Sequence, residues 1–138
     1  MISSAEEFVR LRLSDNQDEY LRAVWEEAPI EVWLEIIDNY PDMRFCVAQN
    51  KMVPSEVLEI LAEDPSDRVR FMVASKNKLS ELLQLKMALD SDSSVRMRIV
   101  MNKKATYSVL IILSEDKSEE IRQKAIEKLA SLSKKSLS

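Results

Sequence analysis

The same pattern of eleven residues occurs four times in this chain of 138 residues, each copy 26 residues after the previous one. The copies read DNYPDMRFCVA from Asp38, DPSDRVRFMVA from Asp64, DSDSSVRMRIV from Asp90 and DKSEEIRQKAI from Asp116. Each copy begins with an aspartate and has an apolar residue five positions later, followed by an arginine. Because no insertion interrupts the copies, we predict an array of similar structural units, each packed on its neighbours.

Two short helices are expected in each repeat, which makes the predicted fold all-α. The first helix contains the apolar residue and the arginine. The second begins near Pro54, Ser80 or Thr106, residue types that favour a helix start. The second helices share an apolar stripe with a spacing of four, typical of a helix and not of a strand: Val53, Val57, Leu61; Leu79, Leu83, Met87; Ala105, Val109, Leu113.

The turns between the two helices of a repeat contain Asn50, Asn77 and Asn102. Glycine is absent from the whole chain, and asparagine is the residue that next best tolerates the left-handed backbone conformation. We therefore expect these asparagines to form the turns in that conformation.

The repeat also predicts the organisation of the chain. We expect a single domain over residues 1–138, which begins with an extra helix from Ala5 to Leu13. Its predicted parts are a degenerate N-terminal repeat or cap (1–37), three repeats (38–63, 64–89 and 90–115), a C-terminal cap (116–132) and a polar tail (133–138).

The chain lacks histidine as well as glycine. Without glycine it has no phosphate-binding loop, dinucleotide turn or nucleophile elbow, since those backbones need glycine. Without histidine it has neither a Ser-His-Asp triad nor an HExxH zinc site. The carboxylates also lack the spacing of a calcium-binding loop. We therefore predict a protein without catalytic activity, cofactor or metal.

The start of the chain and its apolar runs bear on localisation. The first residues, MISSAEE, lack the basic and apolar regions of a signal peptide, and no apolar run is long enough to span a bilayer. Cys46 is the only cysteine, so the chain cannot form an internal disulfide. These features predict a cytoplasmic protein that does not enter a membrane.

The element D-x-x-x-x-[V/I]-R, followed by an A-x-N-like turn and a leucine-rich helix, resembles the repeats of HEAT-like and variant leucine-rich repeat proteins. The resemblance implies a right-handed α-solenoid of about four to five two-helix repeats, a fold used mainly as a protein-binding scaffold. It also implies a structural ladder, in which turn aspartates and helix arginines bond across neighbouring repeats: Asp38, Asp64, Asp90 and Asp116 with Arg44, Arg70, Arg96 and Arg122.

The side of the second helices away from the apolar stripe changes character along the chain. A face that needed only to be soluble would stay polar in every repeat, but here it changes from acidic to leucine. We therefore predict that it binds a partner, together with an exposed Trp25, through these residues: Glu31, Glu56, Glu59, Glu63, Leu82, Leu85 and Leu89. The alternative is that the third repeat is rotated slightly, with Leu85 filling a core position.

Charge is unevenly distributed along the chain. Residues 1–63 hold 14 acidic and 5 basic side chains, a net charge of −9, whereas residues 64–138 hold 10 acidic and 15 basic ones, a net charge of +5. The acidic half suits a basic partner. Some small bacterial solenoids that this chain resembles look like immunity proteins, so a basic toxin or nuclease domain is one expected partner. We expect the free chain to be a monomer.

A basic patch in the second half supports a rival hypothesis, a nucleic-acid-associated HEAT-like protein. Its members are Arg68, Lys76, Lys78, Arg98, Lys103 and Lys104. Phe71 is the single aromatic residue between Arg68 and Lys104 and the total charge is −4, so nucleic acid is the less favoured partner.

Overall fold

The computed structural model describes residues 1–137, with side chains up to residue 134. Within these residues the chain forms ten α-helices and one 3-10 helix and no strand, so the predicted all-α class is confirmed. The chain divides into two compact units, Met1–Val73 and Ala74–Ser138. None of the described helices combines the length and the apolar character that a membrane crossing needs.

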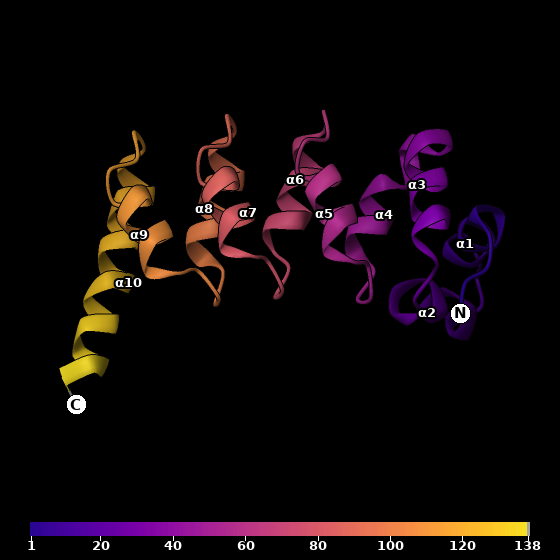
Figure 1. Cartoon of the computed structure of the whole chain (residues 1–138), viewed down its shortest axis with the longest axis horizontal. Coiled ribbons are helices and arrows are strands. Elements are labelled where there is room, and N and C mark those ends of the chain that lie inside the picture. Colours follow the sequence, from indigo (N-terminus) through magenta and orange to yellow (C-terminus); the bar gives the residue numbers. More distant parts are fainter. Residues whose placement is uncertain (138) are drawn as a thin grey trace. The chain divides into compact units, whose positions relative to one another are not determined.

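The first unit contains the N-terminal helices (indigo to magenta in Figure 1). They are α1 (Ala5–Arg12), α2 (Gln17–Trp25), α3 (Ile30–Asn39), the 3-10 helix η1 (Pro41–Met43), α4 (Arg44–Gln49), α5 (Ser55–Leu61) and α6 (Asp67–Ala74), which ends at the junction with the second unit. Helix α1 packs on α2 and α3, and α3 packs on α4 and α5. The buried Phe8 and Trp33 rings pack edge to face, with centroids 5.4 Å apart.

The second unit contains α7 (Glu81–Met87), α8 (Ser93–Met101), α9 (Tyr107–Leu113) and α10 (Glu119–Leu137). Each of α7, α8 and α9 packs on the next helix, α7 also packs on α9, and α8 packs on α10. Packing of consecutive and next-but-one helices is compatible with an array of repeats. The predicted apolar stripe faces the core, since Leu83, Met87, Val109 and Leu113 are all buried.

The second helices begin where the sequence predicts. Helix α5 starts directly after Pro54. The Ser80 hydroxyl accepts a hydrogen bond from the Leu83 N–H, and the Thr106 hydroxyl accepts one from the Val109 N–H. These caps satisfy N–H groups that have no partner within the helix.

Two expectations about local structure differ from what is observed. The asparagine turns are not left-handed: Asn50 has φ −58° and Asn102 has φ −67°, and no described residue has a positive φ. Their side chains instead stabilise the turns, because each Oδ1 accepts a hydrogen bond from the backbone N–H two residues later. The last helix is also longer than expected, because α10 continues to Leu137 and so includes most of the predicted tail at 133–138.

Candidate functional site

Three of the four ladder arginines make the same contact with the turn before their helix. Arg70, Arg96 and Arg122 each donate from Nη1 to the carbonyl oxygen of the repeat aspartate six residues earlier, at 2.7 Å, 2.8 Å and 2.8 Å. The carboxylates of these aspartates, Asp64, Asp90 and Asp116, each accept from the backbone N–H two residues later. The repeated motif therefore fixes the turn that precedes each first helix.

The ladder also connects neighbouring repeats within each unit. Arg44 Nη1 lies 3.4 Å from Asp64 Oδ1 in the first unit, and Arg96 Nε lies 2.8 Å from Asp116 Oδ2 in the second, each pair 20 residues apart. Burial opposes ionisation of Asp116, but the hydrogen bonds from Arg96 and from the Ser118 N–H outweigh it, so the Asp116 pKa is lowered.

Asp38 departs from the ladder. In this copy of the motif, Pro41 comes three positions after Asp38, whereas in the next copy Pro65 directly follows Asp64. Helix α3 runs on to Asn39, so Asp38 lies exposed within it. The helix ends before Pro41, because the residue before a proline, here Tyr40, avoids the helical conformation. Arg44 Nε donates to the Ile37 carbonyl instead, at 2.9 Å.

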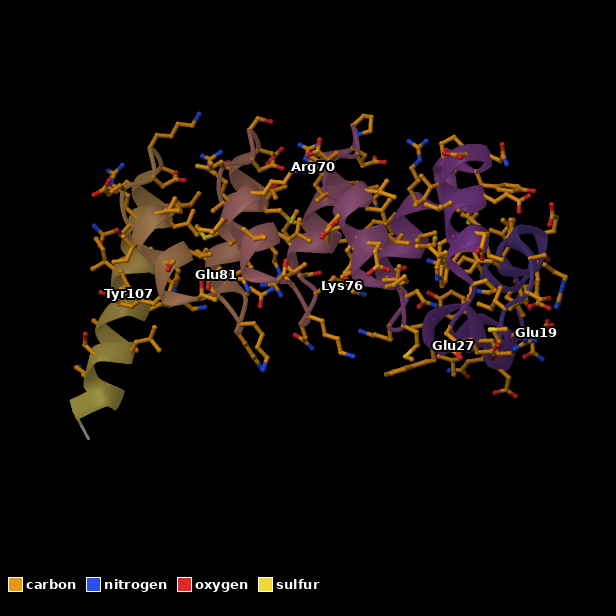
Figure 2. The ribbon with its side chains drawn as sticks, in the orientation of Figure 1. Glu19, Glu27, Arg70, Lys76, Glu81 and Tyr107 are labelled. Carbon is orange, nitrogen blue, oxygen red and sulfur yellow. The ribbon has the colours of Figure 1, made fainter. Side chains whose placement is uncertain are left out.

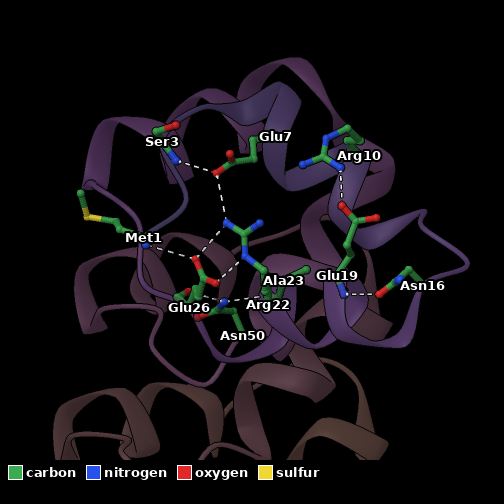
Figure 3. Close-up of polar contacts among 10 residues, drawn as sticks. All are labelled: Met1, Ser3, Glu7, Arg10, Asn16, Glu19, Arg22, Ala23, Glu26 and Asn50. Atoms are coloured by element: carbon green, nitrogen blue, oxygen red, sulfur yellow. Dashed lines mark hydrogen bonds and ion pairs between the residues drawn. The ribbon is translucent and has the colours of Figure 1, made fainter.

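Two buried asparagines form a contact that the sequence analysis missed. Asn50 Nδ2 donates to the carbonyl oxygens of Ala23 and Glu26, at 2.8 Å and 2.9 Å, and its Oδ1 accepts from the Met52 N–H. These bonds hold the turn after α4 against the end of α2 (Figure 3).

Asn102 makes the same contacts in the second unit. Its Nδ2 donates to the carbonyl oxygens of Ala74 and Lys76, at 2.8 Å and 2.9 Å, and its Oδ1 accepts from the Lys104 N–H. Asn50 and Asn102 are 52 residues apart, which is two repeats, so they occupy equivalent positions.

Exposed acidic side chains lie on α3, on α5 and in the turn after α5 in the first unit, and are called here the acidic face of α3 and α5. Glu31, Glu56, Glu59 and Glu63 are all exposed, as predicted from their positions on these helices. Trp25 is 60% exposed at the end of α2, and the Lys51 Nζ lies 5.9 Å from the centre of its ring.

Exposed apolar side chains lie on α7, in the turn after it and on α9 in the second unit, and are called here the apolar face of α7 and α9. Leu82 is 80% exposed and Leu89 is 74% exposed, whereas Leu85 is half-buried. Leu85 does not fill the core position, because Gln84 occupies the buried site equivalent to Leu58 and Leu110. The neighbouring α9 adds three exposed residues that were not among the predicted site residues: Tyr107, Ile111 and Ile112.

The predicted basic patch is divided between the two units. Arg68 belongs to the first unit, where its guanidinium lies 4.9 Å from the centre of the Phe45 ring. The remaining members belong to the second unit: Lys76, Lys78, Arg98, Lys103 and Lys104. There Lys128 Nζ donates to the Asn102 carbonyl at 3.2 Å, and burial, followed by the charges of Arg98 and Lys124, lowers the Lys128 pKa.

A network of charged groups lies at the N-terminal end of the first unit (Figure 3). Arg22 pairs with Glu26, which also lies 3.1 Å from the Met1 amino group. The hydrogen bond from Arg22 lowers the pKa of Glu26, and the same bond raises the pKa of Arg22. Arg10 likewise pairs with Glu19 at 2.7 Å and lowers the pKa of that carboxyl. Of these pairs, Arg10–Glu19 connects α1 to α2, and all of them are at least partly exposed.

One open depression in the second unit is lined mainly by α10, with Met97, Glu119, Glu120 and Glu127 among its residues. The described residues contain no group of three side chains placed to hold a metal ion. Comparisons of the chain with protein-family models, with curated proteins and with solved structures find no match.

Proposed function

We propose that this chain is a non-catalytic protein-binding module whose partner covers the apolar face of α7 and α9. The observation that carries the proposal is the exposure of Leu82 and Leu89, 80% and 74%, beside the exposed apolar residues of the neighbouring α9. Side chains of this kind gain free energy when a partner removes them from water. If the outer side of α7 needed only to be soluble, it would have polar residues in place of these exposed leucines.

The acidic face of α3 and α5 favours a partner that also has a basic region. Glu56, Glu59 and Glu63 are exposed on or next to one short helix. Their negative charges attract a basic surface within about a Debye length, which is 8 to 10 Å. Neutralisation of a basic toxin or nuclease domain is the specific role that we propose for such a surface.

The repeats are proposed to form a right-handed α-solenoid. Support comes from the helix packing within each unit and from the arginine–aspartate pairs with a separation of 20 residues, one in each unit. Small-angle X-ray scattering tests this arrangement, since an extended array has a larger radius of gyration than the roughly 14 to 15 Å of a compact chain of this length.

Capture of a partner from the native host tests the function. Tagged wild-type chain, the pair Leu82→Ser/Leu89→Ser and the pair Glu56→Lys/Glu59→Lys are incubated with nuclease-treated extract, and bound proteins are identified by mass spectrometry. A partner that binds the wild type should be lost with both pairs and retained by the control Ser93→Ala, an exposed residue of α8.

Two results would reject the proposal. One is a partner that binds all variants equally, because it would then use another surface. The other is recovery of nucleic acid alone from extract without nuclease treatment, which would favour the basic residues of the second unit as a nucleic-acid site.

A further inference from the structure

Two turns of the second unit are held together by buried amide side chains. They are the turn before α7 (75–80) and the turn before α9 (102–106), called here the lysine turns. Asn102 donates to the carbonyl oxygens of Ala74 and Lys76, next to and within the first turn. Gln84 Nε2 donates to the carbonyl oxygens of Leu79 and Lys104, both at 3.1 Å, so it bonds to both turns.

Further bonds fix the backbone of the second lysine turn. Gln84 Oε1 accepts from the Thr106 N–H at 3.1 Å, and Asn102 Oδ1 accepts from the Lys104 N–H at 2.9 Å. Gln84 and Asn102 are each 2% exposed. Because buried hydrogen bonds of this kind restrict the backbone, the lysines of both turns extend from a preorganised base.

The lysine turns have a charge of one sign. Their sequences, SKNKLS and NKKAT, contain four lysines and no acidic residue. Lys78, Lys103 and Lys104 are exposed and make no ion pair within the described residues. The turns at the opposite ends of these helices carry acidic residues instead, Asp90 and Asp92 after α7 and Glu115 and Asp116 after α9.

The lysine turns border the apolar face. Tyr107 and Glu81 are the first residues of α9 and α7, and Figure 2 shows both near the same end of the helices as Lys76. Leu82, in the first turn of α7, is therefore close to Lys78 in sequence and lies at this end of the face. An apolar strip with a cationic border at one end has a defined electrostatic complement.

We propose that the segment bound on α7 and α9 is an acidic amphipathic segment of the partner protein. This inference rests on the proposed function and adds the chemistry of the bound segment. Its apolar side chains cover Leu82, Leu89 and Ile111, and its carboxylates lie against the lysine turns. A nucleic acid is disfavoured, because a phosphodiester backbone would gain nothing from the leucine and isoleucine side chains.

Two synthetic peptides that differ only in charge test the proposal. Both have leucines at positions i, i+3, i+4 and i+7 of a helix, and one has glutamates where the other has lysines. Binding to the full chain is measured by fluorescence anisotropy at two salt concentrations. The glutamate peptide should bind more tightly than the lysine peptide, and added salt should reduce the difference.

Variants of the chain identify which residues determine the preference for the glutamate peptide over the lysine peptide. Lys103→Glu/Lys104→Glu should weaken the glutamate peptide about tenfold and strengthen the lysine peptide. The control Lys117→Glu/Lys134→Glu makes the same charge change at exposed residues outside the lysine turns and should keep the wild-type preference. Leu82→Ser/Ile111→Ser should weaken both peptides.

The outcomes separate this inference from the proposed function. If Leu82→Ser/Ile111→Ser weakens both peptides but the lysine peptide binds the wild type as tightly as the glutamate peptide, the acidic chemistry is wrong and the apolar site stands. If neither peptide responds to Leu82→Ser/Ile111→Ser, the apolar site itself is wrong. Tighter binding of single-stranded DNA, unaffected by Leu82→Ser/Ile111→Ser, would also overturn the inference.

Discussion

Arg96 and Asp116 form an ion pair across two successive repeats, with Nε 2.8 Å from Oδ2 and both side chains only 6% exposed. The Arg96 guanidinium also donates to the Asp90 carbonyl, so one arginine joins two turns. Removal of one member of a buried pair leaves the other without its partner, which costs much more than loss of an exposed pair.

Asp116→Asn should therefore destabilise the chain by about 3 kcal/mol. The amide keeps the shape of the carboxylate but removes the charge that Arg96 needs. Urea unfolding followed by circular dichroism at 222 nm measures the free energy of unfolding. Glu115→Gln, an exposed neighbour, is the control and should change it little. Equal stability of the two variants would show that the pair contributes nothing.

The same pair predicts how stability depends on pH. The pKa of Asp116 is lowered in the folded chain, so its contribution is present above the unfolded pKa of about 4 and is lost as pH falls through the folded value. The difference in unfolding free energy between wild type and Asp116→Asn should thus be largest near pH 7 and shrink below about pH 4. A difference that stays constant down to pH 2.5 would contradict this assignment.

Asn50→Ala and Asn102→Ala should each destabilise the chain by about 1 to 3 kcal/mol, because buried carbonyl oxygens lose their donor. Asn77→Ala is the matched control. It removes the same side chain from an equivalent turn, but Asn77 is exposed and should be close to neutral. Thermal unfolding of the three variants compares them directly, and a loss at Asn77 as large as at Asn102 would argue against a specific role for burial.

These asparagines show how far the sequence alone can lead. The period of 26 residues and the apolar stripe predict the helices and their buried sides, since both depend on local spacing. The roles of Asn50 and Asn102 depend on carbonyl oxygens more than 20 residues away, and no local pattern reveals such contacts. Asp38 departs from the ladder because α3 continues through it to Asn39, whereas α5, α7 and α9 each end three residues before the aspartate of their repeat.

The site was predictable to a similar degree. Helical spacing indicated that Leu82, Leu85 and Leu89 lie off the buried stripe, but it could not distinguish exposure from a rotated helix. Gln84 distinguishes these two alternatives, because its amide donates to the Lys104 carbonyl oxygen and accepts from the Thr106 N–H. A polar residue at a buried position equivalent to Leu58 is therefore informative, because it keeps Leu85 out of that position.

Leu82→Ser should leave the free energy of unfolding nearly unchanged, whereas Leu83→Ala should lower it by about 2 to 5 kcal/mol. The two leucines are adjacent in α7, but Leu82 is 80% exposed and Leu83 is 4% exposed. Chemical denaturation of both variants gives the comparison. Substantial destabilisation by Leu82→Ser would mean that this side chain belongs to the core and is not available to a partner.

The two tryptophans should report different environments. Trp25 is 60% exposed, whereas Trp33 is fully buried and its indole N–H has no hydrogen-bond partner. Acrylamide should quench the fluorescence of Trp33→Phe, which retains only Trp25, more strongly than that of Trp25→Phe. The emission maximum of Trp33→Phe should also lie at longer wavelength. Equal quenching of the two variants would show that Trp25 is covered in the free chain.

Every described residue has a negative φ, and the chain contains no glycine. The consequence lies in the unfolded state. Each glycine that a chain lacks removes backbone conformations from its unfolded ensemble, and replacement of one glycine by alanine at a compatible site stabilises a protein by about 0.4 to 1 kcal/mol. This chain therefore loses less backbone entropy on folding than a glycine-containing chain of equal length, and its short helices start from a denatured state that is already restricted.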